Sequence, residues 1–231
     1  MNKVRKFLTD GRIALLLVVL ILVVDQLIKL SVKTNMRLGD MIRVTQWFYI
    51  DFVENNGMAY GMTFVNKLFL SLFRIVAVGF IGWYLYKVLH RQHRLGYVLC
   101  LSMILAGAAG NIFDSMFYGI FFTESTPYDV AQIVGPGQGY APFLEGKVVD
   151  MFYFPLIVTH WPQWVPVWGG EQFIFFSPVF NFADANISVG VILLLLFFRK
   201  DLENVKPQSK EDGESAVTDA VEAKSHEAKS K

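Results

Sequence analysis

The chain has 231 residues, 54% of them hydrophobic, and a mean hydropathy of +0.41. Soluble domains are usually only about 45–50% apolar, so the composition argues against an ordinary water-soluble domain and favours a membrane protein. The net charge of +1 gives no reason to expect nucleic acid or another polyanion as a partner, and the single cysteine, Cys100, excludes an intramolecular disulfide.

Four apolar runs, taken in chain order, predict four transmembrane helices. The first covers about residues 13–33 and follows a basic segment, and because no signal-peptide cleavage site comes soon after it, we expect an uncleaved helix. The other three are expected at about 68–88, 95–117 and 181–198. With its flanks each run has about 20 residues, enough to cross a hydrocarbon core of about 30 Å. The predicted fold is therefore an all-α membrane protein, with residues 1–200 forming one membrane-embedded domain.

Basic residues indicate how these helices are oriented. They gather before the first run, in the turn at 89–95 and directly after the fourth run. By the positive-inside rule these segments are cytoplasmic, which puts both termini in the cytoplasm. The loops at about 34–66 and 119–178 are then expected on the outer, periplasmic side.

The loops and the tail differ in composition. Residues 41–53 are rich in β-branched and aromatic residues and predict a small β-rich subdomain outside the membrane. The second outer loop is long, and its tryptophans at positions 161, 164 and 168 are predicted to anchor it at the membrane interface. Residues 201–231 are polar without an apolar period, so we expect a disordered cytoplasmic tail.

Polar residues gather near the outer ends of the first and third predicted helices. Asp25 lies deep in the first helix, and Lys29 follows one turn later on the same face, where the two can form an ion pair. Asn111 and Asp114 are three residues apart near the outer end of the third helix and share one face. Charged residues inside membrane spans are costly and usually functional, so this boundary is the predicted place of a site.

Further acids fall at the same predicted depth. Asn181 and Asp184 open the fourth helix, and Asp150 precedes an apolar stretch. Two carboxylates that share a site cannot both ionise easily, so one becomes an acid and the other a base, as in aspartic proteases. Spacing alone does not choose among Asp114, Asp150 and Asp184, and ion pairing or helix capping would explain each of them as well.

Other chemistries lack their motifs. The chain has no His-Glu-x-x-His, no Gly-x-Ser-x-Gly and no glycine-rich phosphate loop, and with four histidines in all we expect no metal site and no cofactor. The main alternative to a protease is a small proton- or ion-coupled transporter, because acids within membrane spans are typical of that class. Transporter sites, however, usually lie near the middle of the membrane and between internal repeats.

Five short motifs in order resemble those of the lipoprotein signal peptidases, also called signal peptidase II, over residues 13–199. They are Asp25-Gln26-x-x-Lys29, Asn55-x-Gly57-x-Ala59, Gly107-Ala108-x-Gly110-Asn111-x-x-Asp114, Val148-Val149-Asp150 and Phe180-Asn181-x-Ala183-Asp184.

The resemblance implies an aspartic endopeptidase of the bacterial cell inner membrane with its active site near the outer leaflet. Such an enzyme removes the signal peptide from diacylglyceryl prolipoproteins by cutting before the lipidated cysteine, contacts membrane lipid and is inhibited by globomycin-like peptides. Asp150 and Asp184 match the family's catalytic pair. The matched supporting positions are Asp25, Lys29, Asn55, Gly57, Gly107, Asn111, Asp114 and Asn181. A scaffold that binds lipoproteins without cutting them stays open.

The sequence departs from the family pattern at two places. The family usually has an arginine directly after the aspartate of Gly-Asn-x-x-Asp, and this chain has Ser115 there. We expect Arg74, which lies toward the outer end of the second helix, to supply the missing cation. The loops around Asp150 are also longer than the family pattern suggests.

Overall fold

The structure is a computed structural model and describes residues 3–56, 67–91, 93–135 and 137–203. The chain divides into two compact units, Met1–Leu196 and Phe197–Lys231. The first unit contains almost all of its regular structure, and the second contains the short helix α5. The helices are α1 (Lys3–Asn35), α2 (Lys67–His90), α3 (Leu95–Phe121), α4 (Phe182–Phe197) and α5 (Arg199–Glu203).

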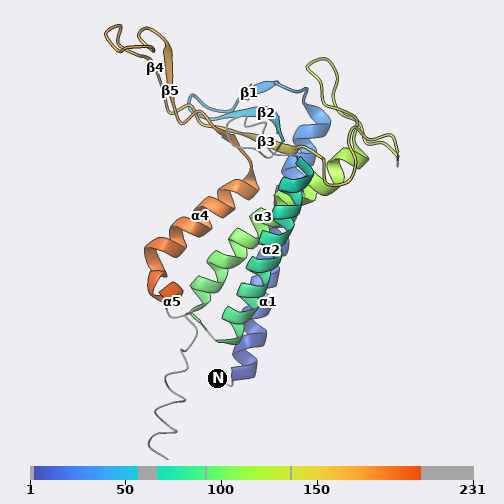
Figure 1. The fold of residues 1–231 in the computed structure, drawn as a ribbon, viewed down its shortest axis with the longest axis vertical. Helices are drawn as coiled ribbons and strands as arrows, with labels where there is room; N and C mark the ends of the chain where they lie inside the picture. The colour runs from blue at the N-terminus through green and yellow to red at the C-terminus, as the bar shows by residue number, and fades with distance from the viewer. Residues whose placement is uncertain (1–2, 57–66, 92, 136, 204–231) are drawn as a thin grey trace, which may run out of the picture. The chain divides into compact units, whose positions relative to one another are not determined.

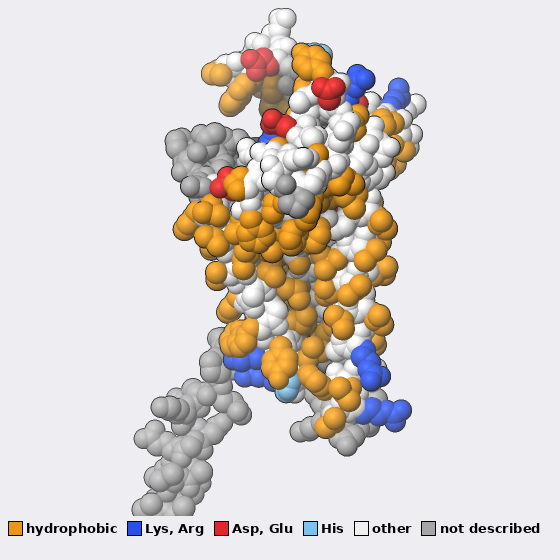
Figure 2. Space-filling model, turned by 90° about the vertical axis from the view of Figure 1, so that its right-hand side faces the viewer, with side chains coloured by type: hydrophobic (Ala, Val, Ile, Leu, Met, Phe, Trp, Pro, Cys, Tyr) orange, Lys and Arg blue, Asp and Glu red, His pale blue; other side chains and the backbone are white. Residues whose placement is uncertain are grey.

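Three of the helices, α1, α2 and α3, are long and apolar enough to cross a membrane. The fourth, α4, is also apolar but has only 16 residues, which corresponds to about 24 Å at 1.5 Å per residue, against about 30 Å of hydrocarbon. Of the four predicted transmembrane helices, three are thus candidate membrane spans, and α4 is not among them. Figure 2 shows a belt of hydrophobic side chains, with Asp and Glu side chains above it and Lys and Arg side chains at both of its ends.

Two helices extend beyond their predicted ends. The first begins at Lys3 instead of about residue 13, because the basic segment before the apolar run is helical too. The third continues to Phe121 rather than 117. At the start of α1 the hydrophobic run marks only the part of the helix that suits lipid, and the lysines and arginines before it are good helix formers that extend the helix. The added residues of α3, Tyr118 to Phe121, contain no basic residue and continue its apolar run. The α5 helix includes residues 201–203, and the rest of the predicted tail lies outside the described residues.

The α3 helix packs against its neighbours α1 and α2 and closely approaches α4. A Cβ atom added to Gly107 would lie 2.3 Å from the carbonyl oxygen of Ala183, and one added to Gly190 would lie 2.9 Å from the carbonyl oxygen of Cys100. Glycines at these two contacts therefore let the α3 and α4 backbones approach each other. One of these contacts holds the start of α4 against the middle of α3.

A four-stranded antiparallel sheet lies at the end of the helices opposite the N-terminus (Figure 1). Its strands, in spatial order, are β1 (Met41–Arg43), β2 (Tyr49–Asn55), β3 (Val148–Tyr153) and β6 (Val179–Phe180). Strands were predicted within 41–53, and the structure adds that β2 pairs with β3 from the second loop. Because β6 pairs with β3 and leads directly into α4, the sheet brings Asp150 beside the start of that helix.

One face of the sheet packs against the helices through a hydrophobic cluster. Phe52 of β2 and Val149 and Met151 of β3 are fully buried there and pack with Val32 of α1 and Tyr118 of α3 in a single hydrophobic cluster. Alternate residues of a strand point to opposite faces, so Val53 and Asp150, which pair across β2 and β3, face the other way. The core thus fixes which face of β3 carries Asp150.

The remaining strands, β4 (Ile157–His160) and β5 (Gln172–Phe175), form a separate hairpin. Trp161 packs on Phe173 with ring centroids 4.9 Å apart and on Trp168 at 6.3 Å. Trp164, by contrast, is 81% exposed. The interfacial role predicted for these tryptophans stays a prediction.

Candidate active site

The site begins at the start of α4, where Asn181 and Asp184 cap each other. The Asp184 backbone N–H donates to Asn181 Oδ1 at 2.9 Å, and the Asn181 backbone N–H donates to Asp184 Oδ2 at 3.4 Å. This reciprocal arrangement is a capping box, with Asp in place of the usual Glu. A third backbone N–H at this helix start, that of Ala183, donates to Asp25 Oδ1 of α1 at 2.9 Å. The N–H groups that a helix start leaves unpaired are thus largely satisfied by side chains.

The side chain of Asn181 also connects α4 to β3 and α3. Its Nδ2 donates to Asp150 Oδ1 at 2.6 Å and to Asn111 Oδ1 at 3.0 Å. Asn111 Nδ2 in turn donates to Asp184 Oδ1 at 2.7 Å. Two amide side chains therefore link the carboxylates of Asp150 and Asp184, which come from positions 34 residues apart in the sequence.

Lys29 is the cation at the centre of the supporting network. Its Nζ lies 2.9 Å from Asp25 Oδ2 and 2.8 Å from Asp114 Oδ2, and it donates to Asn111 Oδ1 at 2.9 Å. The side chain is fully buried, and its three donors have three acceptors, which is the condition for burying an ammonium group without a large penalty. The predicted Asp25–Lys29 pair thus exists and also includes Asp114.

Asp114 ties this network to the sheet. Its Oδ1 accepts from Gln26 Nε2 at 2.8 Å, and its Oδ2 accepts from the Val149 backbone N–H at 3.3 Å, one residue before Asp150. Tyr118 then donates its hydroxyl to Gln26 Oε1 at 3.0 Å. Gln26 and Tyr118 were not among the predicted site residues, although Gln26 adjoins Asp25 and Tyr118 lies one turn after Asp114 on the same face of α3.

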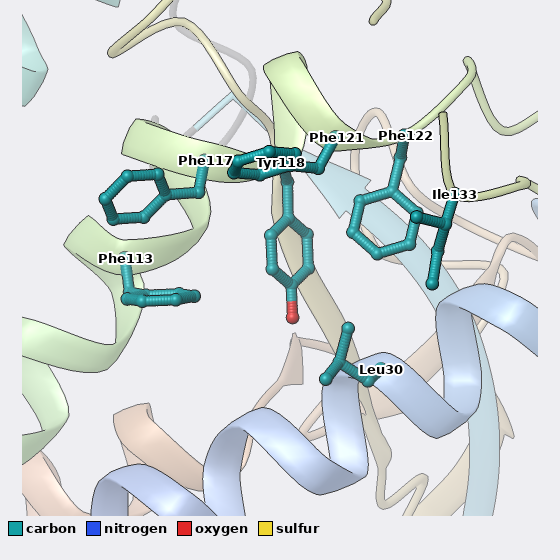
Figure 3. A pocket seen from close by; sticks show the side chains of 7 residues that line it. All are labelled: Leu30, Phe113, Phe117, Tyr118, Phe121, Phe122 and Ile133. Atoms are coloured by element: carbon teal, nitrogen blue, oxygen red, sulfur yellow. The ribbon is translucent and has the colours of Figure 1, made fainter. Parts of the chain in front are cut away.

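An apolar cavity of about 350 Å³ lies beside Tyr118. Figure 3 shows the Tyr118 hydroxyl pointing from α3 toward α1, with the aromatic side chains of α3 around it. The cavity is lined by Leu30, Phe113, Phe117, Tyr118, Phe121, Phe122 and Ile133. Its walls are aromatic and aliphatic. Tyr118 connects this cavity to the polar network through the hydrogen bond from its hydroxyl to Gln26.

The surroundings of Asp150 favour its protonated form. Burial, together with the nearby charge of Asp184, raises the pKa of Asp150 to about 7, while hydrogen bonds from Asn181 and Asn55 hold it lower than it would otherwise be. The guanidinium of Arg74 on α2 interacts electrostatically with Asp184 and Asp150. A carboxyl group whose pKa lies near neutral pH is suited to general acid–base chemistry.

The structure gathers the residues predicted for the site into one cluster, with one exception. Asn55 joins the cluster through its hydrogen bond to Asp150, and Arg74 through its electrostatic interaction with Asp150 and Asp184. The glycines at positions 107 and 110 leave space for the neighbouring groups of the cluster. A Cβ on Gly110 would lie 2.8 Å from Asp25 Oδ2. Gly57 lies outside the described residues. The catalytic and supporting roles of these residues stay predictions.

Known proteins resemble this chain over most of its length. A family model for signal peptidase (SPase) II matches residues 17–199. A lipoprotein signal peptidase of Porphyromonas gingivalis is 50% identical over 218 residues, covering 94% of this chain and 96% of the relative. One from Amoebophilus asiaticus is 33% identical over 208 residues, covering 87% and 82%.

Among solved structures, a bacterial membrane enzyme determined by the in meso method at 1.9 Å resolution has a similar fold. The TM-score is 0.55 at 23% identity, and the match covers 81% of this chain and 93% of the other. At that identity the likeness concerns the fold alone.

Proposed function

The chain belongs to the signal peptidase II family of lipoprotein signal peptidases, and on that premise we propose that it is an aspartic endopeptidase of diacylglyceryl prolipoproteins. The family consists of proteases that act on prolipoproteins, so the chain is a protease. The proposed reaction is hydrolysis of the peptide bond before the lipidated cysteine, which releases the signal peptide. Asp150 and Asp184 are the proposed catalytic pair.

The observation that carries this proposal is the connection between the two carboxylates. Asn181 donates to Asp150 and caps the helix together with Asp184, and Asn111 donates to Asp184. Asp184 accepts hydrogen bonds at both oxygens, as an ionised carboxylate does, whereas the raised pKa of Asp150 near 7 favours a proton on that residue. One proton held between two such groups is the resting state of an aspartic protease.

The proposed mechanism follows from that division. The ionised carboxylate takes a proton from water, and the water oxygen bonds to the scissile carbonyl carbon. The protonated carboxyl group gives its proton to the carbonyl oxygen, which forms a tetrahedral intermediate. The C–N bond then breaks as the amine nitrogen receives a proton from the pair. The products are the signal peptide with a new carboxylate and the protein with a free amino group on its lipidated cysteine.

The neighbouring charges are proposed to support this chemistry. Lys29, held by Asp25 and Asp114, keeps Asn111 oriented toward Asp184. Arg74 interacts with both catalytic carboxylates and is proposed to replace the arginine that the family has where this chain has Ser115. A cation at this place stabilises the negative charge that develops on the carbonyl oxygen.

A member of this family with three long apolar helices is a protein of the bacterial inner membrane. We propose that both termini face the cytoplasm and that the site lies at the outer leaflet. The basic N-terminal segment at one end of α1 and the polar site at its other end support this orientation. A lipidated cysteine anchored in the outer leaflet would then present its peptide bond at the level of the site.

Cleavage of a defined substrate tests the function. The purified full chain in lipid nanodiscs is incubated with a synthetic diacylglyceryl prolipoprotein peptide and, as the matched control, with the same peptide carrying an unmodified cysteine. We expect mass spectrometry to find two products, separated at the bond before the lipidated cysteine, and little cleavage of the control. Binding of the lipidated peptide without any cleavage would support the scaffold alternative and contradict the proposal.

A further inference from the structure

A second buried polar cluster lies outside the candidate site and joins α1, β2 and the segments that follow α3. Lys33 Nζ lies 2.5 Å from Glu54 Oε1 and donates to Ser125 Oγ at 3.0 Å, and Ser125 Oγ donates to the same Glu54 oxygen at 2.7 Å. Lys147 Nζ lies 3.6 Å from Glu54 Oε2 and 3.1 Å from Glu124 Oε1. None of the proposed chemical steps uses these residues.

The central pair of this cluster is fully enclosed. The Lys33 side chain is 0% exposed and that of Glu54 is 1% exposed. The ammonium of Lys33 also lies 5.3 Å from the ring centre of Phe122 and 5.2 Å from that of Tyr140, and Figure 3 shows Phe122 beside Tyr118 at the end of α3. A buried ion pair is weak evidence of stabilisation, because desolvation offsets most of its attraction. Its geometry fixes the position of the elements that carry it.

The position that this pair fixes is the register of β2. Glu54 pairs with Val149, whose side chain lies in the buried hydrophobic cluster, so Glu54 points to the helices. Asn55, the next residue, pairs with Val148 and points to the opposite face, which also carries Asp150. A slip of one residue would exchange the two faces and would remove both the Glu54–Lys33 contact and the Asn55–Asp150 hydrogen bond.

We propose that Lys33 and Glu54 are positioning residues that hold β2 in the register where Asn55 bonds to Asp150. The inference rests on the proposed function, because Asp150 is one of its two catalytic carboxylates. The pair acts from the face of the sheet that packs on the helices, with Ser125 bonded to the same Glu54 oxygen as Lys33 and Lys147 beside the other oxygen. On α1, the i, i+4 spacing places Asp25, Lys29 and Lys33 in series. The first two contact α4 and α3, and Lys33 contacts β2.

The charges that face Asp150 come from three helices. They are Asp184 of α4, Lys29 of α1 and Arg74 of α2. On its own sheet, the Asn55 hydrogen bond lowers the pKa of Asp150. Loss of that bond, with the other three charges unchanged, therefore raises the pKa of Asp150 further above its value of about 7.

The test replaces the pair while keeping its volume. The double variant Lys33→Met/Glu54→Leu removes both charges together, so no unpaired charge is left buried. The matched control is Glu124→Gln, which alters the exposed partner of Lys147 in the same region. In the cleavage assay we expect kcat of the double variant to fall about tenfold to a hundredfold, the cost of a small misplacement of a reacting group. KM and the control should stay near the wild-type values.

A readout independent of cleavage is the titration of Asp150, followed by NMR of ¹³C-labelled aspartate and assigned with Asp150→Asn. Its midpoint should rise in the double variant and stay unchanged in Glu124→Gln. If the double variant unfolds well below the wild type, Lys33→Met/Glu54→Gln, which keeps an acceptor for Ser125, takes its place with the same two readouts. Wild-type kcat together with a wild-type midpoint would overturn the inference. Failure of the wild type to cleave would refute the proposed function, and the Asp150 midpoint would still decide the role of the pair.

Discussion

Asn181 donates a 2.6 Å hydrogen bond from Nδ2 to Asp150 Oδ1. The same side chain caps α4 through its oxygen, which accepts from the Asp184 backbone N–H. One amide thus couples a strand of the sheet to a helix end, and it does so between the two carboxylates proposed to share a proton. The capping role and the connecting role use different atoms, so they can be separated by substitution.

Asn181→Ser separates them. Serine is as good an N-cap as asparagine, so the free energy of unfolding should fall only by the cost of the two lost Nδ2 hydrogen bonds, about 1–3 kcal/mol. Serine cannot reach Asp150 with an amide donor, so kcat should fall about tenfold to a hundredfold. Thermal unfolding and the prolipoprotein cleavage rate measure the two effects. An Asn181→Ser variant with full activity would show that the hydrogen bond to Asp150 serves only the fold.

Gly107→Ala tests the close contact of α3 with the start of α4. The new Cβ would lie 2.3 Å from the Ala183 carbonyl oxygen, so α4 must shift, at a cost of about 1–3 kcal/mol, and Asp184 must shift with it. We expect both a lower unfolding temperature and a lower cleavage rate. The matched control is Gly79→Ala on α2, where a Cβ meets nothing within 4 Å. The account fails here if both variants behave alike.

The pH dependence follows from Asp150, whose pKa is raised from 3.8 to about 7 by burial and by Asp184. If the protonated form is the active one, kcat/KM should fall as the pH rises through about 7. The folding stability that protonation of Asp150 contributes is complete below pH 3.8 and is lost as the pH rises to about 7, because the folded state keeps a proton that the unfolded state has released. Asp150→Asn should therefore lose stability less steeply than the wild type across this range. Parallel curves for the two proteins in thermal unfolding at several pH values would count against this assignment.

Arg74→Ala should lower the cleavage rate about tenfold to a hundredfold, by removing a cation that interacts with both carboxylates. Arg74→Lys should retain part of the activity because it keeps the charge. Lys87→Ala, near the other end of α2, is the control and should cleave normally. If Arg74→Ala processes the substrate at the wild-type rate, another group supplies the cation that the family pattern lacks at Ser115.

The sequence predicted the helices and the paired polar residues because both depend on local spacing. Long apolar runs indicate α1, α2 and α3, and the i, i+4 spacing of Asp25 and Lys29 puts them on one face. The helix ends were less predictable, since the basic residues before residue 13 are also helical, and the apolar run of α4 proved to be a helix of only 16 residues.

The sheet could not be predicted, because strand pairing joins segments nearly a hundred residues apart. Strands were expected in residues 41–53, but nothing local indicates that β2 pairs with Val148–Tyr153 or that β6 leads Asn181 to Asp150. Predicted depth put Asp150 and Asp184 at the same membrane boundary, but only the family motifs selected these two as a pair. Lys33, one turn after Lys29, was a local signal of the second buried cluster that the sequence analysis did not use.

The central claim is that Asp150 and Asp184 together carry the hydrolysis. The most direct measurement is the single-turnover cleavage rate of a diacylglyceryl prolipoprotein by the wild type, Asp150→Asn and Asp184→Asn, with Asp129→Asn as an exposed aspartate control. Each catalytic variant should lose at least about a thousandfold in rate, with wild-type substrate binding and folding, and the control should cleave at the full rate. Robust cleavage by either Asp150→Asn or Asp184→Asn would contradict the account.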